Sequence, residues 1–232
     1  MNKVVVVNYG TKYPENFTHR IYNMVKRNTT QPFEFYVLTD NVDLYPDYKV
    51  IDISKEEEKG WWCKLLMFKP NILPEGKYLY LDLDVVIVDN IDCIFDWKPF
   101  GILRDFIRPN SGLMPGKEYN SSVMVFEPHK LANLYNYYID NKKYFKLRQE
   151  EIHFFGDQCV ISAYFNTHSK FLNVIPDEWC WSFKKGVERG KHAGDRSRMF
   201  GDEIPKDGKI CVFHGVPNPT DVNIDWVKQH YQ

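Results

Sequence analysis

The sequence predicts an α/β fold in which a mainly parallel sheet is flanked by helices. Strand-like and helix-like segments alternate through the first 76 residues, in the order strand, helix, strand, strand, helix. The first segment, VVVVN at 4–8, is a continuous β-branched run ending in Asn, typical of a strand covered on both faces. In such folds, ligands bind beyond the carboxyl ends of the strands, so polar residues at those ends are candidates for a binding site.

Each expected element has its own local signal. After Pro14, the apolar residues Phe17, Ile21, Met24 and Val25 recur at helical spacing. The acidic cluster KEEEK at 55–59 is expected to be a solvated loop or the start of a helix. Further strands are expected at 33–40, 48–53, 77–84, 121–128, 171–176 and 209–215, and further helices at 61–70, 131–140 and 155–165.

Composition narrows the class of protein. The 232 residues are 44% hydrophobic, enough for the core of a single domain. Thirty basic and 31 acidic residues leave a net charge of −1, which argues against general attraction to nucleic acid or an anionic membrane. The N-terminal apolar run of four residues is too short for a secretory signal or a membrane span, so a cytoplasmic protein is expected. The sequence does not indicate an oligomeric state.

The five cysteines are dispersed and form no CxxC pair. This pattern disfavours a disulfide framework and a zinc site, so reduced thiols are expected.

Two acids stand in the apolar stretch KYLYLDLDVVIVDNID at 77–92. In a regular strand, Asp82 and Asp84 would point to the same face, where burial without partners would cost several kcal/mol. A divalent cation such as Mg²⁺ or Mn²⁺ would compensate, because hard oxygen ligands suit these ions. The alternative is that the strand ends at Leu83 and both carboxylates are solvated. The spacing alone leaves both interpretations open.

Four segments in order resemble the GT-A superfamily of glycosyltransferases. YLYLDLDVVIVDNID carries an Asp-x-Asp motif, and YNSSVMVFEP at 119–128 is similar to a segment at the acceptor site of many members. FGDQCVIS at 155–162 and VFHGVPNP at 212–219 are similar to the Asp-Gln and His-Gly segments of glycosyltransferase family 8 and related bacterial and viral members. The resemblance implies a single-domain, Rossmann-like GT-A fold with a nucleotide-binding half at 1–90 and an acceptor half at 91–232.

The resemblance also implies residue roles. A Mn²⁺ or Mg²⁺ ion would be held by Asp82, Asp84 and His214. The donor-binding residues would be Asn8, Tyr9, Thr39, Asp40, Lys64, Asp82, Gly215 and Asn218. The catalytic residues would be Asp157, Gln158 and Asn120, and the acceptor would meet Ser121 and Trp181.

Two of these assignments rest on local context. Of four tryptophans that could stack on a sugar, Trp181 is preferred over Trp61, Trp62 and Trp179 because WCWS at 179–182 lies outside any expected strand. Asn218 stands where many relatives carry a lysine that grips the diphosphate. Either Asn218 makes a weaker neutral contact, or a cation from a mobile loop expected at about 184–209 takes over, with candidates Lys185, Arg189 and Lys191.

The expected activity is metal-dependent transfer of a hexose from a nucleoside-diphosphate sugar to a glycan or protein. The resemblance favours UDP over GDP and retention over inversion. Two alternatives stay open. A sugar nucleotidyltransferase would also use paired carboxylates, but NYGTKYP at 8–14 has a single glycine where a phosphate loop would be rich in them. A non-catalytic nucleotide-sugar or carbohydrate-binding module would use the same residues without turnover.

Overall fold

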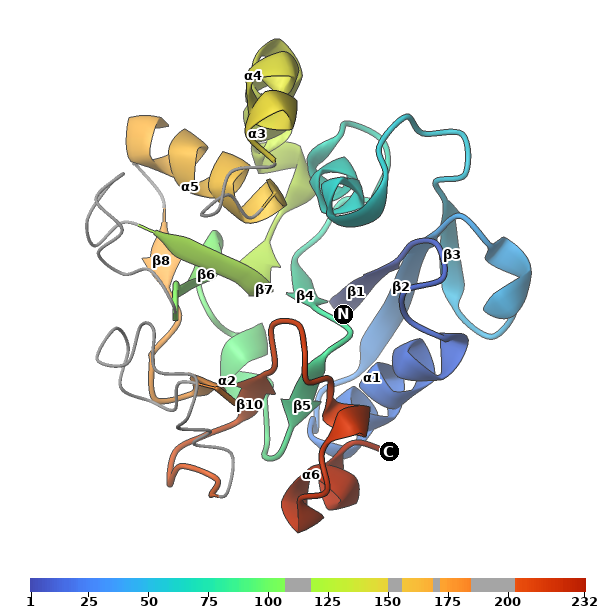
Figure 1. Ribbon diagram of the computed structural model, residues 1–232, viewed down its shortest axis with the longest axis vertical. Coiled ribbons are helices and arrows are strands. Elements are labelled where there is room, and N and C mark those ends of the chain that lie inside the picture. Colours follow the sequence, from blue (N-terminus) through green and yellow to red (C-terminus); the bar gives the residue numbers. More distant parts are fainter. Residues whose placement is uncertain (107–117, 150–155, 169–171, 185–202) are drawn as a thin grey trace.

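A seven-stranded mixed sheet runs through the middle of the protein (Figure 1). The computed structural model describes residues 1–106, 118–149, 156–168, 172–184 and 203–232. The strand order is β3-β2-β1-β4-β7-β6-β8, and β7 is the strand that runs antiparallel to both of its neighbours. The predicted α/β class with a mainly parallel sheet is therefore confirmed. The strands are β1 (Asn2–Asn8), β2 (Phe33–Thr39), β3 (Lys49–Asp52), β4 (Tyr78–Leu81), β6 (Gly101–Arg104), β7 (Tyr119–Phe126) and β8 (Asn173–Val174).

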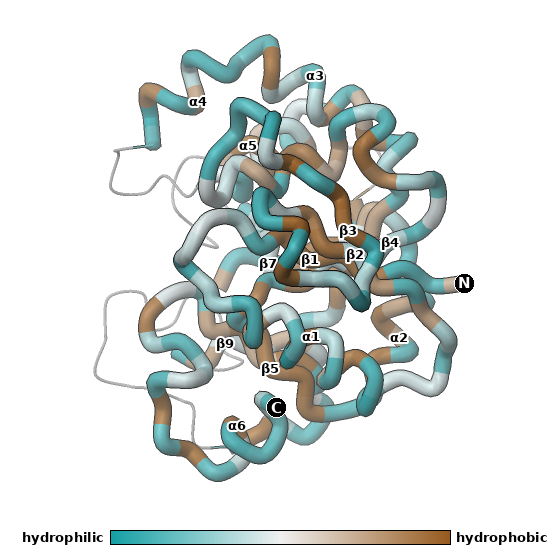
Figure 2. The backbone as a smooth tube through the Cα atoms, turned by 90° about the vertical axis from the view of Figure 1, so that its right-hand side faces the viewer, coloured by the Kyte–Doolittle hydropathy of each residue, from teal (hydrophilic) through white to brown (hydrophobic). Residues whose placement is uncertain are grey.

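The central strands are buried on both faces, which explains their near-continuous hydrophobicity. In β1, Val4 and Val6 join the core on one face of the sheet, while Val5 joins the core on the other. In β4, Leu79 and Tyr80 divide in the same way. Figure 2 shows these hydrophobic stretches gathered in the interior, with hydrophilic segments outside.

Helices cover one face of the sheet, and a helix with a second, smaller sheet covers the other (Figure 1). The first layer contains the 3-10 helix η2 (Gly60–Phe68), α3 (Ala132–Asp140) and α5 (Gly156–His168). The second layer contains α1 (Glu15–Arg27) and the three-stranded sheet of β5 (Val85–Ile87), β10 (Ile210–Val212) and β9 (Cys180–Ser182). The remaining elements are η1 (Val42–Leu44), α2 (Asp92–Phe95), η3 (Pro128–Lys130), α4 (Lys142–Arg148), η4 (Pro219–Asp221) and α6 (Asp225–His230).

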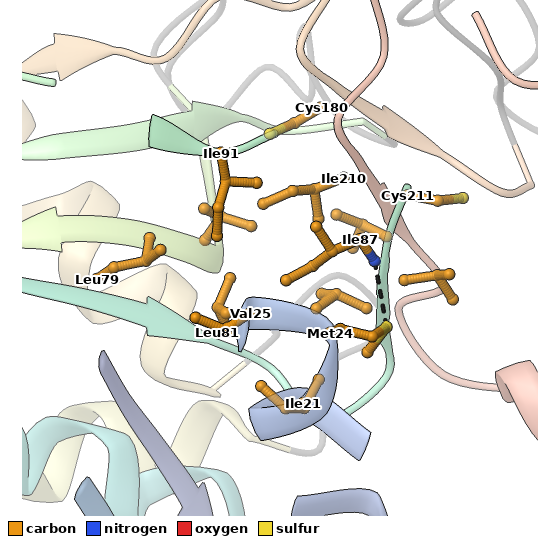
Figure 3. Packing of buried hydrophobic residues seen from close by; sticks show 14 of the residues in the cluster. Ile21, Met24, Val25, Leu79, Leu81, Ile87, Ile91, Cys180, Ile210 and Cys211 are labelled. Carbon is orange, nitrogen blue, oxygen red and sulfur yellow. Dashed lines mark hydrogen bonds between the residues drawn. The ribbon is translucent and has the colours of Figure 1, made fainter. Parts of the chain in front are cut away.

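Helix α1 connects the two sheets through its apolar face. Ile21, Met24 and Val25 are fully buried, as their helical spacing predicts. Figure 3 shows this face packed toward Ile87 of β5, whose backbone N–H donates to the Met24 sulfur over 3.3 Å. This packing places the small sheet next to the carboxyl end of β4, which β5 follows in the chain.

Three sequence expectations need correction. The 61–70 helix is a 3-10 helix, because its hydrogen bonds close over three residues and it ends before Pro70. The strand expected over 77–84 ends at Leu81. The WCWS segment is not outside a strand, since Cys180–Ser182 forms β9 by pairing in parallel with β10.

The KEEEK cluster is not uniformly solvated. Glu58 is buried beneath Lys142 and Lys146, which lie 2.6 Å and 2.8 Å from its carboxylate oxygens, and Tyr138 donates to it over 2.7 Å. Burial opposes ionisation of Glu58, but the two ammonium groups outweigh burial and lower the pKa of the carboxyl. The cluster therefore attaches the start of η2 to α3 and α4.

All five cysteines are free, as expected, and Cys63, Cys180 and Cys211 are buried. Within the described ranges, the chain has no helix with both the length and the apolar character needed to span a bilayer.

Candidate active site at the carboxyl edge of the sheet

The Asp-x-Asp motif forms the turn that carries the chain from the large sheet into the small one. Strand β4 ends at Leu81, and β5 begins at Val85. Antiparallel β7 starts beside the end of β4, so the Asp82 N–H donates to the Ser122 carbonyl over 2.9 Å. Because β10 pairs with β5, the Phe213 N–H donates to the Asp84 carbonyl over 3.2 Å. Sheet pairing alone therefore brings three of the four sequence motifs together.

Lys64 connects the fourth motif, the Asp-Gln segment that contains Asp157, to this turn. Its ammonium lies 2.9 Å from Asp82 Oδ1 and 3.3 Å from Asp157 Oδ2. It also donates to the Ser121 hydroxyl over 3.1 Å, and that hydroxyl donates to Asp157 over 2.7 Å. The Lys64 side chain is 12% exposed. The four residues come from η2, the β4 end, the start of β7 and the first turn of α5, and they form one largely buried cluster in which two acids share one cation.

The charges of this cluster depend on one another. Burial disfavours the Lys64 ammonium, yet the carboxylates of Asp157 and Asp82 raise its pKa above the ordinary value. At Asp82 burial acts against the carboxylate, but attraction to Lys64 and the hydrogen bond from Tyr80 lower the pKa. At Asp157 burial outweighs Lys64 and raises the pKa. Removing Lys64 would leave both acids without a compensating charge.

Asp84 occupies a different environment from Asp82. It is 4% exposed, and its Oδ2 accepts from the Tyr13 hydroxyl over 3.2 Å and from the Gly215 N–H over 3.0 Å. Burial and the nearby Asp82 charge raise the pKa of Asp84. The interpretation of both acids as solvated loop residues is therefore wrong, although the strand does end early. Because β4 ends at Leu81, the Asp82 carboxylate lies against Lys64, whereas the Asp84 carboxylate lies against Tyr13 and Gly215.

His214 lies two residues after the end of β10, next to the acid turn. Its Nε2 lies 2.6 Å from the Ser182 hydroxyl, and its ring stacks on Phe106 with centroids 5.8 Å apart. Its backbone φ is +39°, and that of Gly215 is +98°, so the chain turns sharply here. This turn is what presents the Gly215 N–H to Asp84.

The described residues contain no group of three His, Cys, Asp or Glu side chains positioned to hold a metal ion. Asp82 and Asp84 fit one as a donor set, since they are hard oxygen ligands close enough for the Asp82 charge to raise the pKa of Asp84. His214 Nε2 is engaged by the Ser182 hydroxyl, so this nitrogen would have to leave Ser182 to join them. The fold therefore places Asp82, Asp84 and His214 near one another, but their side chains are not arranged to bind a metal ion together.

The predicted catalytic residues form a second network beside Lys64. Asn120 Nδ2 donates to Gln158 Oε1 over 3.3 Å, and Asn120 Oδ1 accepts from the Ser122 N–H over 2.9 Å. Gln158 Nε2 in turn donates to Asp105, which follows β6. The amide of Gln158 is therefore oriented from two sides.

The predicted donor-side residues at the first two strand ends divide into two kinds. Asn8 and Thr39 are buried: Asn8 donates to the Tyr45 and Thr18 hydroxyls over 2.6 and 3.2 Å, and Thr39 accepts from the Asn41 N–H. Their side chains are engaged inside the fold. Tyr9 is partly exposed, and Asp40 accepts from the Gly10 N–H over 2.9 Å, which joins the ends of β1 and β2.

Asn218 precedes η4 and donates its backbone N–H to Asp221 over 2.8 Å. Lys184 contacts the His-Gly turn. Its ammonium donates to the His214 carbonyl over 3.2 Å and lies 3.9 Å from where a Cβ on Gly215 would stand. The loop candidates Lys185, Arg189 and Lys191 lie outside the described residues, as does most of the expected mobile loop.

Of the two predicted acceptor residues, Ser121 lies in the cluster and Trp181 does not. Trp181 is 1% exposed in the core, against Gly208 and Trp226. Its pairing within β9 turns the ring inward, which leaves no face for a sugar. The preference for Trp181 is corrected accordingly.

Sequence reasoning overlooked several partners of the site. The Tyr80 hydroxyl donates to Asp82 over 2.6 Å, and the alternation in YLYLDLD could have indicated this because residues two apart share a face. Tyr13, Ser182 and Asp105 carry no such signal, since each reaches the site from a distant segment.

The mixed, mainly parallel sheet flanked by helices has the GT-A fold, and solved glycosyltransferases of that fold superpose on the chain. The galactosyltransferase LgtC, solved with donor and acceptor sugar analogs, aligns with a TM-score of 0.67 and 12% identity, over 99% of this chain and 96% of LgtC. The glycosyltransferase GlyE of Streptococcus pneumoniae TIGR4 aligns with a TM-score of 0.70 and 14% identity, over 98% of this chain and 60% of GlyE.

A curated relative is also a glycosyltransferase. The glycosyltransferase GlyB of Streptococcus pneumoniae serotype 4 is 22% identical over 157 residues, which are 63% of this chain and 35% of GlyB. The match thus spans about a third of that relative's length. No protein-family model matches the chain.

Proposed function

We propose that the protein is a metal-dependent glycosyltransferase that moves a hexose from a nucleoside-diphosphate sugar, with UDP as the nucleotide, to a glycan or protein. The observation that carries the proposal is the Lys64 cluster. A buried cation joins the Asp-x-Asp turn to Asp157 at the carboxyl edge of the sheet, where α/β folds bind ligands. The fold shared with glycosyltransferases, and the likeness to GlyB, support the same class of activity.

In this proposal the acid turn would face the donor diphosphate. Asp82 and Asp84, joined by His214 once it leaves Ser182, would hold Mn²⁺ or Mg²⁺. The bound ion would stabilise the negative charge that develops on the departing diphosphate. The Gly215 N–H holds Asp84 in place, and Lys64 fixes Asp82, so the chain supplies a preorganised ligand pair.

Lys184 is the described cation beside the His-Gly turn. Its ammonium would attract the diphosphate where Asn218 supplies no charge. In this proposal Lys184 fills the role that the sequence assigned to Lys185, Arg189 or Lys191.

The sugar side of the reaction would fall to the Asn120–Gln158 network. The anomeric carbon–oxygen bond to the diphosphate breaks, the acceptor hydroxyl oxygen forms the new glycosidic bond, and its proton passes to the departing phosphate. The amide oxygen of Gln158, oriented by Asn120 and Asp105, would stabilise the positive charge that builds on the sugar ring. A front-side path of this kind gives retention.

The test is thermal unfolding with UDP or GDP, each with and without Mn²⁺, for wild type and Asp84→Asn. A ligand that binds the native state raises the midpoint by mass action. We expect the midpoint to rise most with UDP and Mn²⁺ together, and the Asp84→Asn variant to lose that rise. Asp89→Asn is the matched control, because Asp89 lies in the same segment with its side chain 63% exposed.

Hydrolysis of UDP-sugars by the wild type, measured alongside, separates an enzyme from a non-catalytic binding module. Absence of a midpoint shift with every nucleotide, or a shift that Asp84→Asn leaves unchanged, would contradict the proposed site.

A further inference from the structure

Trp61 is the exposed member of the four tryptophans that sequence analysis considered for sugar stacking. It is 52% exposed, whereas Trp62 and Trp181 are 4% and 1% exposed, and Trp179 is partly buried against Trp97. A half-exposed aromatic ring adds little to the core, and its exposed surface is open to a ligand. The position of Trp61 relative to the Lys64 cluster indicates which ligand that surface would meet.

The 3-10 geometry of η2 sets that position. With three residues per turn, side chains three apart lie on the same side of such a helix, so Trp61 lies one turn from Lys64 on one face. Lys64 points into the cluster with Asp82 and Asp157. Trp61 therefore stands at the rim of the same site.

The indole is also held against the first turn of α5. A Cβ on Gly156 would lie 2.3 Å from Trp61 Cδ1 and 2.4 Å from Nε1, so the ring rests directly on the glycine backbone. Gly156 has a φ of +51°, and the next residue is Asp157 of the cluster. Figure 1 shows the teal coil of residues 60–68 next to the start of α5. The five-membered ring is thus supported by backbone while much of the residue remains in solvent.

Resting on the proposed function, we infer that Trp61 is a stacking platform for a pyranose ring of the acceptor. A pyranose has an apolar C–H face that packs on an indole, and its hydroxyls at the ring edge need polar neighbours. The polar groups of the cluster that reach solvent are the Lys64 and Asp82 side chains, which are 12% and 20% exposed and offer such neighbours. The inference makes the acceptor a glycan with an accessible sugar ring, and it assigns the stacking role that Trp181 does not fill.

The test measures binding of methyl β-glucopyranoside, methyl β-galactopyranoside and methyl N-acetyl-β-glucosaminide by saturation-transfer NMR, in the presence of UDP and Mn²⁺. We expect at least one glycoside to bind wild type, and Trp61→Ala to weaken that binding by about tenfold. Trp61→Phe, which keeps an aromatic face, should bind within about threefold of wild type. Leu147→Ala is the control, because Leu147 is 72% exposed on α4.

Failure of the inference and failure of the proposed function give different results. If UDP and Mn²⁺ raise the midpoint but no glycoside binds wild type, or Trp61→Ala binds it unchanged, the stacking role is wrong. If UDP and Mn²⁺ do not raise the wild-type midpoint, the proposed function fails instead. We expect the control Leu147→Ala to keep the nucleotide-dependent shift, the donor hydrolysis and the glycoside binding of wild type.

Discussion

The Lys64 ammonium lies 3.3 Å from the Asp157 carboxylate, so a 3-10 helix before β4 is joined to a helix from the second half of the chain. Asp82 shares the same ammonium at 2.9 Å. Two acids and one cation are thus buried together, and removing the cation leaves both carboxylates without a compensating charge.

Lys64→Met should therefore destabilise the fold strongly. Removing the cation leaves two buried carboxylates without their partner, and we expect the free energy of unfolding to fall by about 3 kcal/mol. Urea denaturation measures this. Lys49→Met is the control, because Lys49 pairs with Glu34 at a 54% exposed position, where water screens the pair, and its stability should stay close to that of wild type.

Combining Lys64→Met with Asp157→Asn should recover part of the lost stability, because the double variant buries one unpaired carboxylate fewer. Strictly additive losses in the two single variants and the double variant would show that Lys64 and Asp157 are not coupled.

Asp84→Asn and His214→Ala should each abolish Mn²⁺-dependent turnover while the protein melts within a few degrees of wild type. For Asp84→Asn the physical reason is that burial and the Asp82 charge both oppose the carboxylate, so a neutral amide relieves repulsion in the metal-free protein. Its Oδ1 can still accept from the Gly215 N–H. Calorimetry with a chelator present measures the melting temperature of the metal-free protein, and activity assays with Mn²⁺ measure turnover. Near-normal activity in either variant would refute the metal assignment.

Gly156→Ala should destabilise the protein through two separate effects. The φ of +51° costs a side chain about 1 kcal/mol, and the new methyl would collide with the Trp61 indole. Gly10→Ala is a matched control, since Gly10 has a φ of +69° but no atom within 4 Å of its added Cβ. We expect Gly156→Ala to lose more stability in urea than Gly10→Ala.

Adding Trp61→Ala to Gly156→Ala should remove the collision and leave the backbone cost. If the two glycine variants lose equal stability, the indole does not rest on Gly156 as described.

Asp92 should make stability depend on acid pH. Burial opposes its charge, but hydrogen bonds from Thr29, Thr30 and Asn90 outweigh burial and lower the pKa of Asp92 to about 2. Because the folded pKa lies below the unfolded value of about 3.9, this stabilisation is present above about pH 4 and is lost as pH falls toward 2. We expect about 1 kcal/mol, after screening by water at this partly exposed position.

The stability difference between wild type and Asp92→Asn, measured in urea from pH 2 to 7, should therefore shrink below about pH 4. A difference that stays constant across this range would rule out the ionised Asp92 as its source.

The sequence by itself determined the layers and the segments that meet at the carboxyl edge. Continuous apolar runs such as 4–8 identify strands buried on both faces, and the spacing of Phe17, Ile21 and Met24 identifies α1, because periodicity follows directly from side-chain direction. The resemblance at the Asp-x-Asp, Asn-Ser, Asp-Gln and His-Gly segments named residues that the structure gathers into one region.

Only the tertiary structure decided which of those residues touch. The Lys64–Asp157 pair, the burial of Glu58 and Trp181, and the exposed Trp61 all depend on pairings between segments far apart in the chain. A short strand such as β9 is defined by its hydrogen bonds to β10, which local residue pattern does not specify. The sequence therefore indicates what chemistry is present, and long-range packing sets which groups are paired, buried or open to a ligand.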